Sequence, residues 1–331
     1  MFKFINKLRM MSKIKRGFGN YIGGDFEKAL KYYDEVLKIE PNCKYALTYK
    51  AMVLADLGEF NNALKYYDKS INSNPHYIDT WRYKIELILN EFNYSFALET
   101  VNKGLELNND NLDLLNLKIS ILVECKKFKH ALKIANYGLK IHPKSEASGY
   151  MKAMVLDRMG CIEKSIHCFD KLTKSYPYFP DGWFGLAVEN NKLNNSDLAI
   201  KFIEKAISIK YVEEYVYLYI IILVEKLEDY DKGLEVINDL LESRKYPFNE
   251  ESYSTIYFLK GKIMDEKNEI DNAIENYETA IEIYKIIIRK YHDNLKNYGE
   301  IVNYNECYDD LDIWKENCLF AKNRLKKLKL S

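Results

Sequence analysis

The sequence repeats itself at a spacing of 34 residues, and this period constrains the fold more than any other feature. A small residue recurs through six consecutive steps of 34, and one more follows after 40. The residue three places earlier is large and apolar in every repeat except the sixth, which has Ser196. A period of this length is typical of arrays in which each repeat packs only on its neighbours. The small positions are Ala29, Ala63, Ala97, Ala131, Ser165, Ala199, Gly233 and Ala273.

Two further columns predict that each repeat is a pair of helices. A small side chain lets two helices approach closely, and the large residue before it fills the space alongside. In four repeats a proline stands twelve residues after the small residue. It ends the second helix, because proline has no N–H to donate. Glycine stands at the turn inside three repeats, where a left-handed conformation ends a helix. The prolines are Pro41, Pro75, Pro143 and Pro177, the glycines are Gly24, Gly58 and Gly160, and Phe92, Lys126, Asn194 and Glu228 fill the turn position elsewhere.

Composition and charge agree with an all-α chain and disfavour a nucleic-acid binder. The 331 residues are 47% hydrophobic and contain only 6 prolines and 14 glycines. Residues 1–24 carry six bases and no acid, and residues 322–331 carry five bases and no acid. Removing those eleven bases leaves 38 against 49 acids, so the middle of the chain has a formal charge of −11. We therefore expect no nucleic acid along the array, since its binding requires cations opposite phosphates. Whether the basic ends contact a membrane or RNA stays open.

No segment predicts membrane insertion or export. The longest strongly apolar run, Tyr215 to Val224, is ten residues, whereas a spanning helix needs about 20. The N-terminus has charges scattered among its apolar residues and lacks the uninterrupted core of a secretory signal. The six cysteines show no close paired spacing, so we expect reduced thiols and a cytoplasmic location.

The columns together resemble the tetratricopeptide repeat family, whose pattern is W-x2-L-G-x2-Y, then A-x3-F, then P. The best-matching stretch runs from Tyr45 to Pro75, and Trp81 and Trp183 occupy the tryptophan column. The resemblance implies an all-α, right-handed superhelical solenoid of about eight helix pairs. It covers residues 10–287, with an irregular insertion near 243–253. Residues 1–9 form a basic N-terminal segment, and residues 288–331 form an extension that ends in a capping helix with a basic tail.

One column departs from the family pattern. Where the family usually has leucine, five repeats have lysine. A lysine can lay its aliphatic stem on the core while its amine stays in water, so we expect the fold to tolerate the change. These lysines are Lys50, Lys84, Lys118, Lys152 and Lys260.

Motifs of enzymes and metal sites are missing from the sequence. The glycine-rich segment Gly17 to Gly24 does not match GxGxxG and no strand precedes it, and no Walker A, HExxH or GxSxG motif occurs. Cys161, His167 and Cys168 are the only close Cys/His cluster, and their spacing does not suit zinc. We therefore expect a chain that is not an enzyme, with no catalytic, cofactor-binding or metal-binding residues.

The resemblance also implies where a partner binds, because the first helix of each pair lines the concave surface in that family. The implied groove is rich in Tyr and Met, which suit a peptide or helix with apolar anchors. The predicted function is a non-catalytic protein–protein interaction scaffold. Packing of the same residues between helices, self-assembly of basic ends on the acidic middle of another copy, and an enzyme site without a motif are the alternatives. The predicted partner-binding residues are Tyr45, Tyr49, Met52, Arg82, Tyr83, Glu86, Tyr150, Met154 and Phe184, and repeat 7 adds Tyr215, Tyr219 and Glu225 to the groove.

Overall fold

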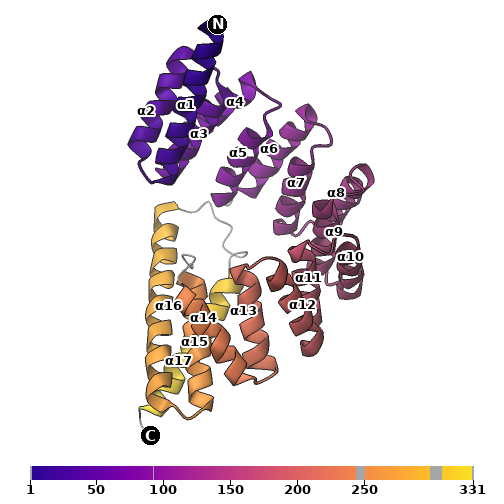
Figure 1. Cartoon of the computed structure of the whole chain (residues 1–331), viewed down its shortest axis with the longest axis vertical. Helices are drawn as coiled ribbons and strands as arrows, with labels where there is room; N and C mark the ends of the chain where they lie inside the picture. Colours follow the sequence, from indigo (N-terminus) through magenta and orange to yellow (C-terminus); the bar gives the residue numbers. More distant parts are fainter. Residues whose placement is uncertain (1, 92, 244–249, 299–307, 330–331) are drawn as a thin grey trace. The chain divides into compact units, whose positions relative to one another are not determined.

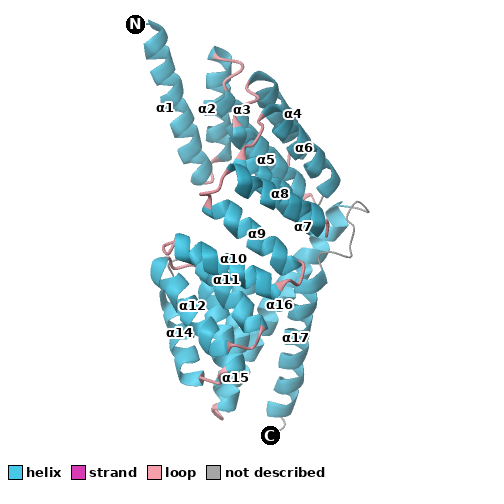
Figure 2. Ribbon diagram, turned by 90° about the vertical axis from the view of Figure 1, so that its right-hand side faces the viewer, coloured by secondary structure: helices cyan, strands magenta, loops and turns pink. Residues whose placement is uncertain are grey.

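The structure is a computed structural model that describes residues 2–91, 93–243, 250–298 and 308–329 (Figure 1). The described residues form seventeen α-helices and one π-helical turn, and they contain no strand. Short loops join consecutive helices (Figure 2). The chain divides into two compact units, an N-terminal unit of residues Met1–Gly160 and a C-terminal unit of residues Cys161–Ser331, which are described separately.

The N-terminal unit contains four consecutive helix pairs, repeats 1–4, and the first helix of repeat 5. Each helix packs on the next one along the chain, as expected for a repeat array. The first helices are α1 (Phe2–Ile22), α3 (Lys44–Asp56), α5 (Ile78–Asn90), α7 (Leu112–Glu124) and α9 (Glu146–Arg158). The second helices are α2 (Phe26–Ile39), α4 (Phe60–Ser73), α6 (Tyr94–Leu107) and α8 (Phe128–Ile141).

The C-terminal unit begins with the second helix of repeat 5 and continues through repeats 6–8. The first helix of repeat 7 is interrupted, since α13 (Glu213–Ile221) passes directly into the π-helical turn Ile222–Lys226. The insertion predicted near residues 243–253 lies largely outside the described residues. The remaining helices are α10 (Ile162–Ser175), α11 (Pro180–Lys192), α12 (Ser196–Ile209), α14 (Tyr230–Ser243), α15 (Glu250–Glu266), α16 (Ile270–Tyr298) and α17 (Tyr308–Leu328).

The small-residue column lies where paired helices touch. Ala29, Ala63, Ala97, Ala131, Ser165, Ala199 and Ala273 are each fully inaccessible to solvent. At Gly233 even a methyl group would approach Val224 Cγ2 to 2.9 Å, so only glycine fits there without a shift. The structure therefore confirms that these small side chains lie at the contact between paired helices, where they let the helix axes approach closely.

The turns inside the repeats share one backbone conformation, whichever residue occupies them. Gly24, Gly58 and Gly160 have φ values of 78°, 76° and 72°, in the left-handed region. Lys126, Asn194 and Glu228 have φ values of 54°, 58° and 52° at the equivalent position. The packed helices therefore impose the turn even where the residue is unsuited to it, at a cost of about 1 kcal/mol or more for a residue with a Cβ. Phe92, at the same position in repeat 3, lies outside the described residues.

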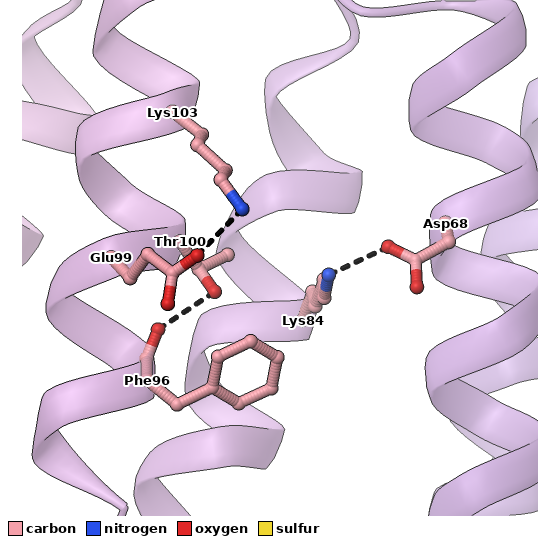
Figure 3. A network of polar contacts seen from close by, with 6 residues as sticks. All are labelled: Asp68, Lys84, Phe96, Glu99, Thr100 and Lys103. Carbon is pink, nitrogen blue, oxygen red and sulfur yellow. Dashed lines mark hydrogen bonds and ion pairs between the residues drawn. The ribbon is translucent and has the colours of Figure 1, made fainter.

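Three of the five column lysines have a polar side-chain partner, whereas the sequence predicted that their amines stay in water. Lys50 Nζ lies 2.5 Å from Asp34 Oδ1, and Lys84 Nζ lies 2.6 Å from Asp68 Oδ1 (Figure 3). Both acids come from the second helix of the preceding repeat. In repeat 8 Lys260 makes the equivalent contact, donating to Asn238 Oδ1 at 2.9 Å. Lys50, Lys84 and Lys260 thus each link consecutive repeats through a charged or polar contact.

Helix α17 covers an apolar face of the last repeat, as the capping-helix prediction requires. Its residues Ala321, Leu325 and Leu328 are buried in the core of the C-terminal unit. Arg324 donates two hydrogen bonds to the Asp265 carboxylate, at 2.6 Å from Nε and 2.7 Å from Nη2. A bidentate pair of this kind fixes orientation as well as position.

Among the described residues, no helix combines the length and the apolar composition needed to cross a membrane.

Candidate functional site

The first helices of repeats 1–3 bring five aromatic rings together, and we call this set the aromatic surface. It comprises Phe18 and Tyr21 of α1, Tyr45 and Tyr49 of α3, and Tyr77, which precedes α5. The ring centroids of Phe18 and Tyr49 are 5.3 Å apart, and those of Tyr45 and Tyr77 are 5.3 Å apart in an edge-to-face arrangement. Such contacts add about 0.5–1.5 kcal/mol each and hold the rings in place. The aromatic surface is therefore preorganised across three repeats.

Cations lie at the beginning of α3 and α5. Lys44 Nζ lies 5.1 Å from the Tyr45 ring centroid and 4.4 Å from that of Tyr77. Arg82 stacks on Tyr83 at 4.7 Å. These cation–π contacts place positive charge beside aromatic faces.

Acidic groups lie at the other end of the same helices. Asp56, the last residue of α3, accepts a hydrogen bond of 2.7 Å from Tyr21 Oη. Burial raises the pKa of Tyr21 to about 12, and the neighbouring Asp56 contributes to this rise by favouring the protonated phenol. Tyr21 therefore remains a hydrogen-bond donor at neutral pH. Lys44 lies at the start of α3 and Asp56 at its end, while Arg82 near the start of α5 is paired with Asp79 at 3.6 Å.

Glu86 of α5 adds a second carboxylate to this region. Its side chain is exposed, yet the protein around it raises its pKa through desolvation, an effect that Arg82 partly offsets. An accessible carboxylate that is poorly hydrated gains more from an incoming cation or hydrogen-bond donor than a fully solvated one does.

Besides Arg82 and Glu86, the predicted site residues fall into three groups. Tyr45 and Tyr49 are members of the aromatic surface, while Met52 and Tyr83 pack beside it on the core formed by α3, α4 and α5. Tyr150 and Met154 are half-buried residues of α9, three repeats after α3. Phe184 belongs to the C-terminal unit, so the structure does not place it with the others.

Sequence reasoning missed three members of the aromatic surface. Phe18 and Tyr21 stand at the ninth and twelfth places of repeat 1, so the rule applied to later repeats would have found them. Tyr77 precedes its helix, and only the packing of Tyr45 against it shows that it belongs to the surface.

The groove assignment in repeat 7 was wrong for Tyr215 and Tyr219. Both are buried, with exposed fractions of 2% and 7%. The Tyr215 ring stacks on Phe184 at 4.7 Å and its hydroxyl donates to Asp181, while the Tyr219 hydroxyl donates to Glu204 Oε1 at 2.7 Å. They are core residues that join neighbouring helices of the C-terminal unit.

The π-helical turn explains this error. The first helices of repeats 2–6 have 13 residues each, whereas α13 and the turn together have nine plus five. The loop before α13, residues 210–212, is correspondingly one residue shorter than the four-residue loops before α3, α5, α7, α9 and α11. The two changes cancel in the 34-residue period but displace every residue of α13 by one place. Glu214 and Leu218 therefore occupy the positions assigned to Tyr215 and Tyr219.

Groups that could support metal or thiol chemistry are sparse in the described chain. No cluster of three or more His, Cys, Asp or Glu side chains with the geometry of a metal site occurs there. Cys43, Cys125, Cys161 and Cys168 take part in no disulfide. The side chains of Cys307 and Cys318 lie outside the described residues.

The architecture defines an all-α helical-repeat protein, and comparison with known proteins identifies the repeat. Models of the tetratricopeptide repeat match residues 23–77, 180–212 and 254–286, which lie in both units. The chain contains tetratricopeptide repeats. The sequence matches no curated protein significantly.

Solved structures of tetratricopeptide repeat proteins resemble the chain. One from Parabacteroides merdae aligns over 95% of this chain and 98% of its own, with a TM-score of 0.53 and 16% identity, and has the same fold. YrrB, described as a tetratricopeptide repeat protein with an unusual peptide-binding site, aligns over 55% of this chain and 94% of its own, with a TM-score of 0.39 and 18% identity.

Proposed function

We propose that this protein is a non-catalytic interaction scaffold that binds a segment of a partner protein on the aromatic surface of the N-terminal unit. The tetratricopeptide repeat fold supports a protein-interaction role at the general level, because a repeat array presents an extended surface. The observation that carries the specific proposal is the row of partly exposed rings formed by Phe18, Tyr45 and Tyr49.

The chemistry of the aromatic surface suits a peptide with apolar anchors. Tyrosine offers a large apolar ring at low entropic cost and a hydroxyl that can meet a peptide group. Met52 adds an adaptable apolar side chain next to the rings. Because the rings are already held by one another, binding does not require them to be ordered further.

The charge distribution sets the orientation of the partner. Lys44 and Arg82, the latter paired with Asp79 at 3.6 Å, stand near the start of their helices, whereas Asp56 and Glu86 stand in their later turns. A bound segment is thus expected to place acidic or carbonyl groups toward the first pair and basic or amide groups toward the second. The predicted residues Tyr150 and Met154, on α9 of the same unit, would extend this binding to repeat 5.

Site-specific photocrosslinking tests the proposal. A photoreactive phenylalanine analogue placed at Phe18 or Tyr45 is expected to crosslink one contiguous segment of a partner, identified by mass spectrometry. The same analogue at Tyr178, which is 83% exposed in the C-terminal unit, is the matched control. Crosslinks shared equally by all three positions would contradict the proposal.

A synthetic peptide of the crosslinked segment then gives a direct affinity. The Phe18→Ala, Tyr45→Ala, Tyr83→Ala triple variant is expected to bind it at least about tenfold more weakly, since truncating each aromatic anchor costs on the order of 1 kcal/mol or more. The Tyr137→Ala, Tyr178→Ala double variant removes exposed tyrosines elsewhere and should bind normally. Circular dichroism confirms that both variants remain helical.

A further inference from the structure

The C-terminal unit contains an open cavity of about 730 Å³. Its volume lies within the range of about 300–1,000 Å³ that is typical of ligand sites. It opens among α11, α13 and α15, and all of its lining residues belong to this unit. The lining comprises Phe184, Val188, Lys210, Tyr211, Val212, Glu213, Glu214, Tyr217, Leu218, Ile221 and Ser252.

The π-helical turn decides which face of α13 meets this cavity. Leu227 N donates to Ile222 O at 3.1 Å across five residues, which is the hydrogen bond that marks the wide turn. Without the extra residue, the 34-residue period would direct Tyr215 and Tyr219 to this face. With it, Tyr217, Leu218 and Ile221 line the cavity instead. π-turns of this kind are often found at functional sites.

The floor and the rim of the cavity differ in chemistry. Val188, Leu218 and Ile221 are partly exposed apolar side chains, and Phe184 is held in place by its stacking on Tyr215. Glu213 and Glu214 are two acids at the rim against a single base, Lys210, so the lining has a formal charge of −1. No ion pair to either glutamate occurs among the described residues.

We propose that this cavity, which we call the π-turn pocket, is a second binding site that takes large apolar side chains of a partner segment with lysine or arginine beside them. The apolar floor supplies affinity through burial, and the two rim glutamates select the flanking cation. The inference rests on the proposed function in one respect, that the chain binds segments of other proteins. It assigns a separate site, in a separate unit, with its own specificity.

Four synthetic peptides of about 14 residues, roughly four turns if helical, test the two halves of the claim independently. They combine leucine or serine at three core positions with lysine or glutamate at the flanking positions, and their affinities are measured by fluorescence anisotropy with the full chain. The leucine–lysine peptide is expected to bind at least about tenfold more tightly than the other three. Equal binding of the serine–lysine peptide would show attraction by charge alone, and equal binding of the leucine–glutamate peptide would show that the rim selects nothing. Either result overturns the proposal.

Charge reversal locates the peptide at the rim. The Glu213→Lys, Glu214→Lys variant is expected to bind the leucine–glutamate peptide better than the leucine–lysine peptide, reversing the preference. The matched control is Asp197→Lys on α12, an exposed acid of the same unit outside the lining, which should leave the preference unchanged. An unchanged preference in the Glu213, Glu214 variant would place the peptide elsewhere and overturn the proposal.

A register variant tests the role of the π-turn itself. Deleting Val224 and inserting one residue in the loop 210–212 preserves the 34-residue period and restores a regular first helix. The variant is expected to keep its helical circular dichroism and to lose binding of the leucine–lysine peptide by at least about tenfold. If the variant fails to fold, Val188→Arg, which fills the floor from a partly exposed position, tests instead whether the peptide occupies the π-turn pocket and should weaken binding by at least about tenfold. Retained binding in a folded variant would contradict the proposal.

The proposal for the π-turn pocket can be tested independently of the proposal for the aromatic surface. The Phe18→Ala, Tyr45→Ala, Tyr83→Ala variant leaves every lining residue of the π-turn pocket intact. It should therefore bind the leucine–lysine peptide normally even though it loses the segment crosslinked at the aromatic surface. Loss of peptide binding in this variant would mean that the peptide occupies the aromatic surface, and would overturn the assignment to the π-turn pocket.

Discussion

Lys84 Nζ lies 2.6 Å from Asp68 Oδ1, and this contact joins the first helix of repeat 3 to the second helix of repeat 2 (Figure 3). The lysine side chain is 10% exposed, while the aspartate side chain is 54% exposed. The aliphatic stem is thus buried and the amine reaches a carboxylate at the edge of the interface. The same lysine also lies 5.5 Å from the Phe96 ring centroid.

Removing the aspartate of this pair should lower the free energy of unfolding more than replacing the lysine with an apolar residue. We expect Asp68→Ala to reduce the free energy of unfolding by about 1 kcal/mol, because Lys84 loses its partner while the exposed side of the contact still admits water. Asp68→Asn should cost less, since Asn238 accepts from Lys260 in the same way in repeat 8. Lys84→Leu should be neutral or stabilising, because apolar packing replaces a desolvated charge.

Urea unfolding followed through Trp81 measures these changes locally, because Trp81 is buried in the same repeat and its indole N–H donates to Pro75 O at 2.8 Å. Trp183→Phe and Trp314→Phe in all variants leave Trp81 as the sole reporter. A larger loss of stability in Lys84→Leu than in Asp68→Ala would show that the ion pair itself stabilises the interface.

Two glycines of α1 should respond oppositely to alanine. A Cβ at Gly17 would lie 2.7 Å from Tyr33 Cε1, so Gly17→Ala is expected to destabilise by about 1–3 kcal/mol through overpacking. A methyl group at Gly19 would meet no atom within 4 Å, and Gly19→Ala should stabilise by about 0.5–1 kcal/mol through helix propensity. Thermal unfolding midpoints of the two variants, measured side by side, check the difference. Stabilisation by both would show that Tyr33 moves aside freely.

Replacing Lys126 with glycine should stabilise the turn inside repeat 4. Lys126 has a φ of 54°, a conformation that favours glycine, so Lys126→Gly is expected to stabilise the chain by about 0.5–1 kcal/mol. Lys133→Gly, in the exposed interior of α8, is the matched control and should destabilise by about 1 kcal/mol. Both are measured by urea unfolding through Trp81. A loss of stability in Lys126→Gly would mean that the lysine side chain contributes more than its backbone costs.

Glu86 should make stability depend on pH. Its pKa in the folded chain is raised above 4.5 by desolvation, so the folded state holds the proton more tightly than the unfolded state does. The contribution of Glu86 is therefore fully present below pH 4.5 and is lost as the pH rises through the raised pKa. Glu86→Gln should remove this decline and be more stable than the wild type at neutral pH.

Unfolding midpoints measured from about pH 4 to about pH 8 for the wild type, Glu86→Gln and Glu124→Gln test this prediction. Glu124 is an exposed acid of α7, and its replacement serves as the control for removing one negative charge. Identical pH profiles for the wild type and Glu86→Gln would show that Glu86 is hydrated as well in the folded chain as in the unfolded one.

The helix pairs could be predicted from the repeat pattern, because the residues that form and end each helix lie close together in the sequence. A small residue permits close packing wherever it occurs, and the helix it belongs to is set by neighbours within a few residues. The resemblance to the repeat family, rather than the columns, assigned Tyr45 and Tyr49 to a binding groove, and their ring centroids lie 6.5 Å apart on α3. The turn residues were harder to judge, since Lys126 and Glu228 adopt a glycine-like conformation that only packing imposes.

Only the tertiary structure shows at which residue each helix begins, and therefore which side chains the helix buries. A single residue moved from the loop 210–212 into the first helix of repeat 7 leaves the period unchanged, so periodicity cannot detect it. Yet a one-residue displacement turns a helix face by about 100°, burying Tyr215 and presenting Leu218 to the π-turn pocket. The lysine column shows the same limit in another form. Its residues were visible in the sequence, but the partner of Lys84 is Asp68, and only the packing of one repeat on the next brings an amine 16 positions away to that carboxylate.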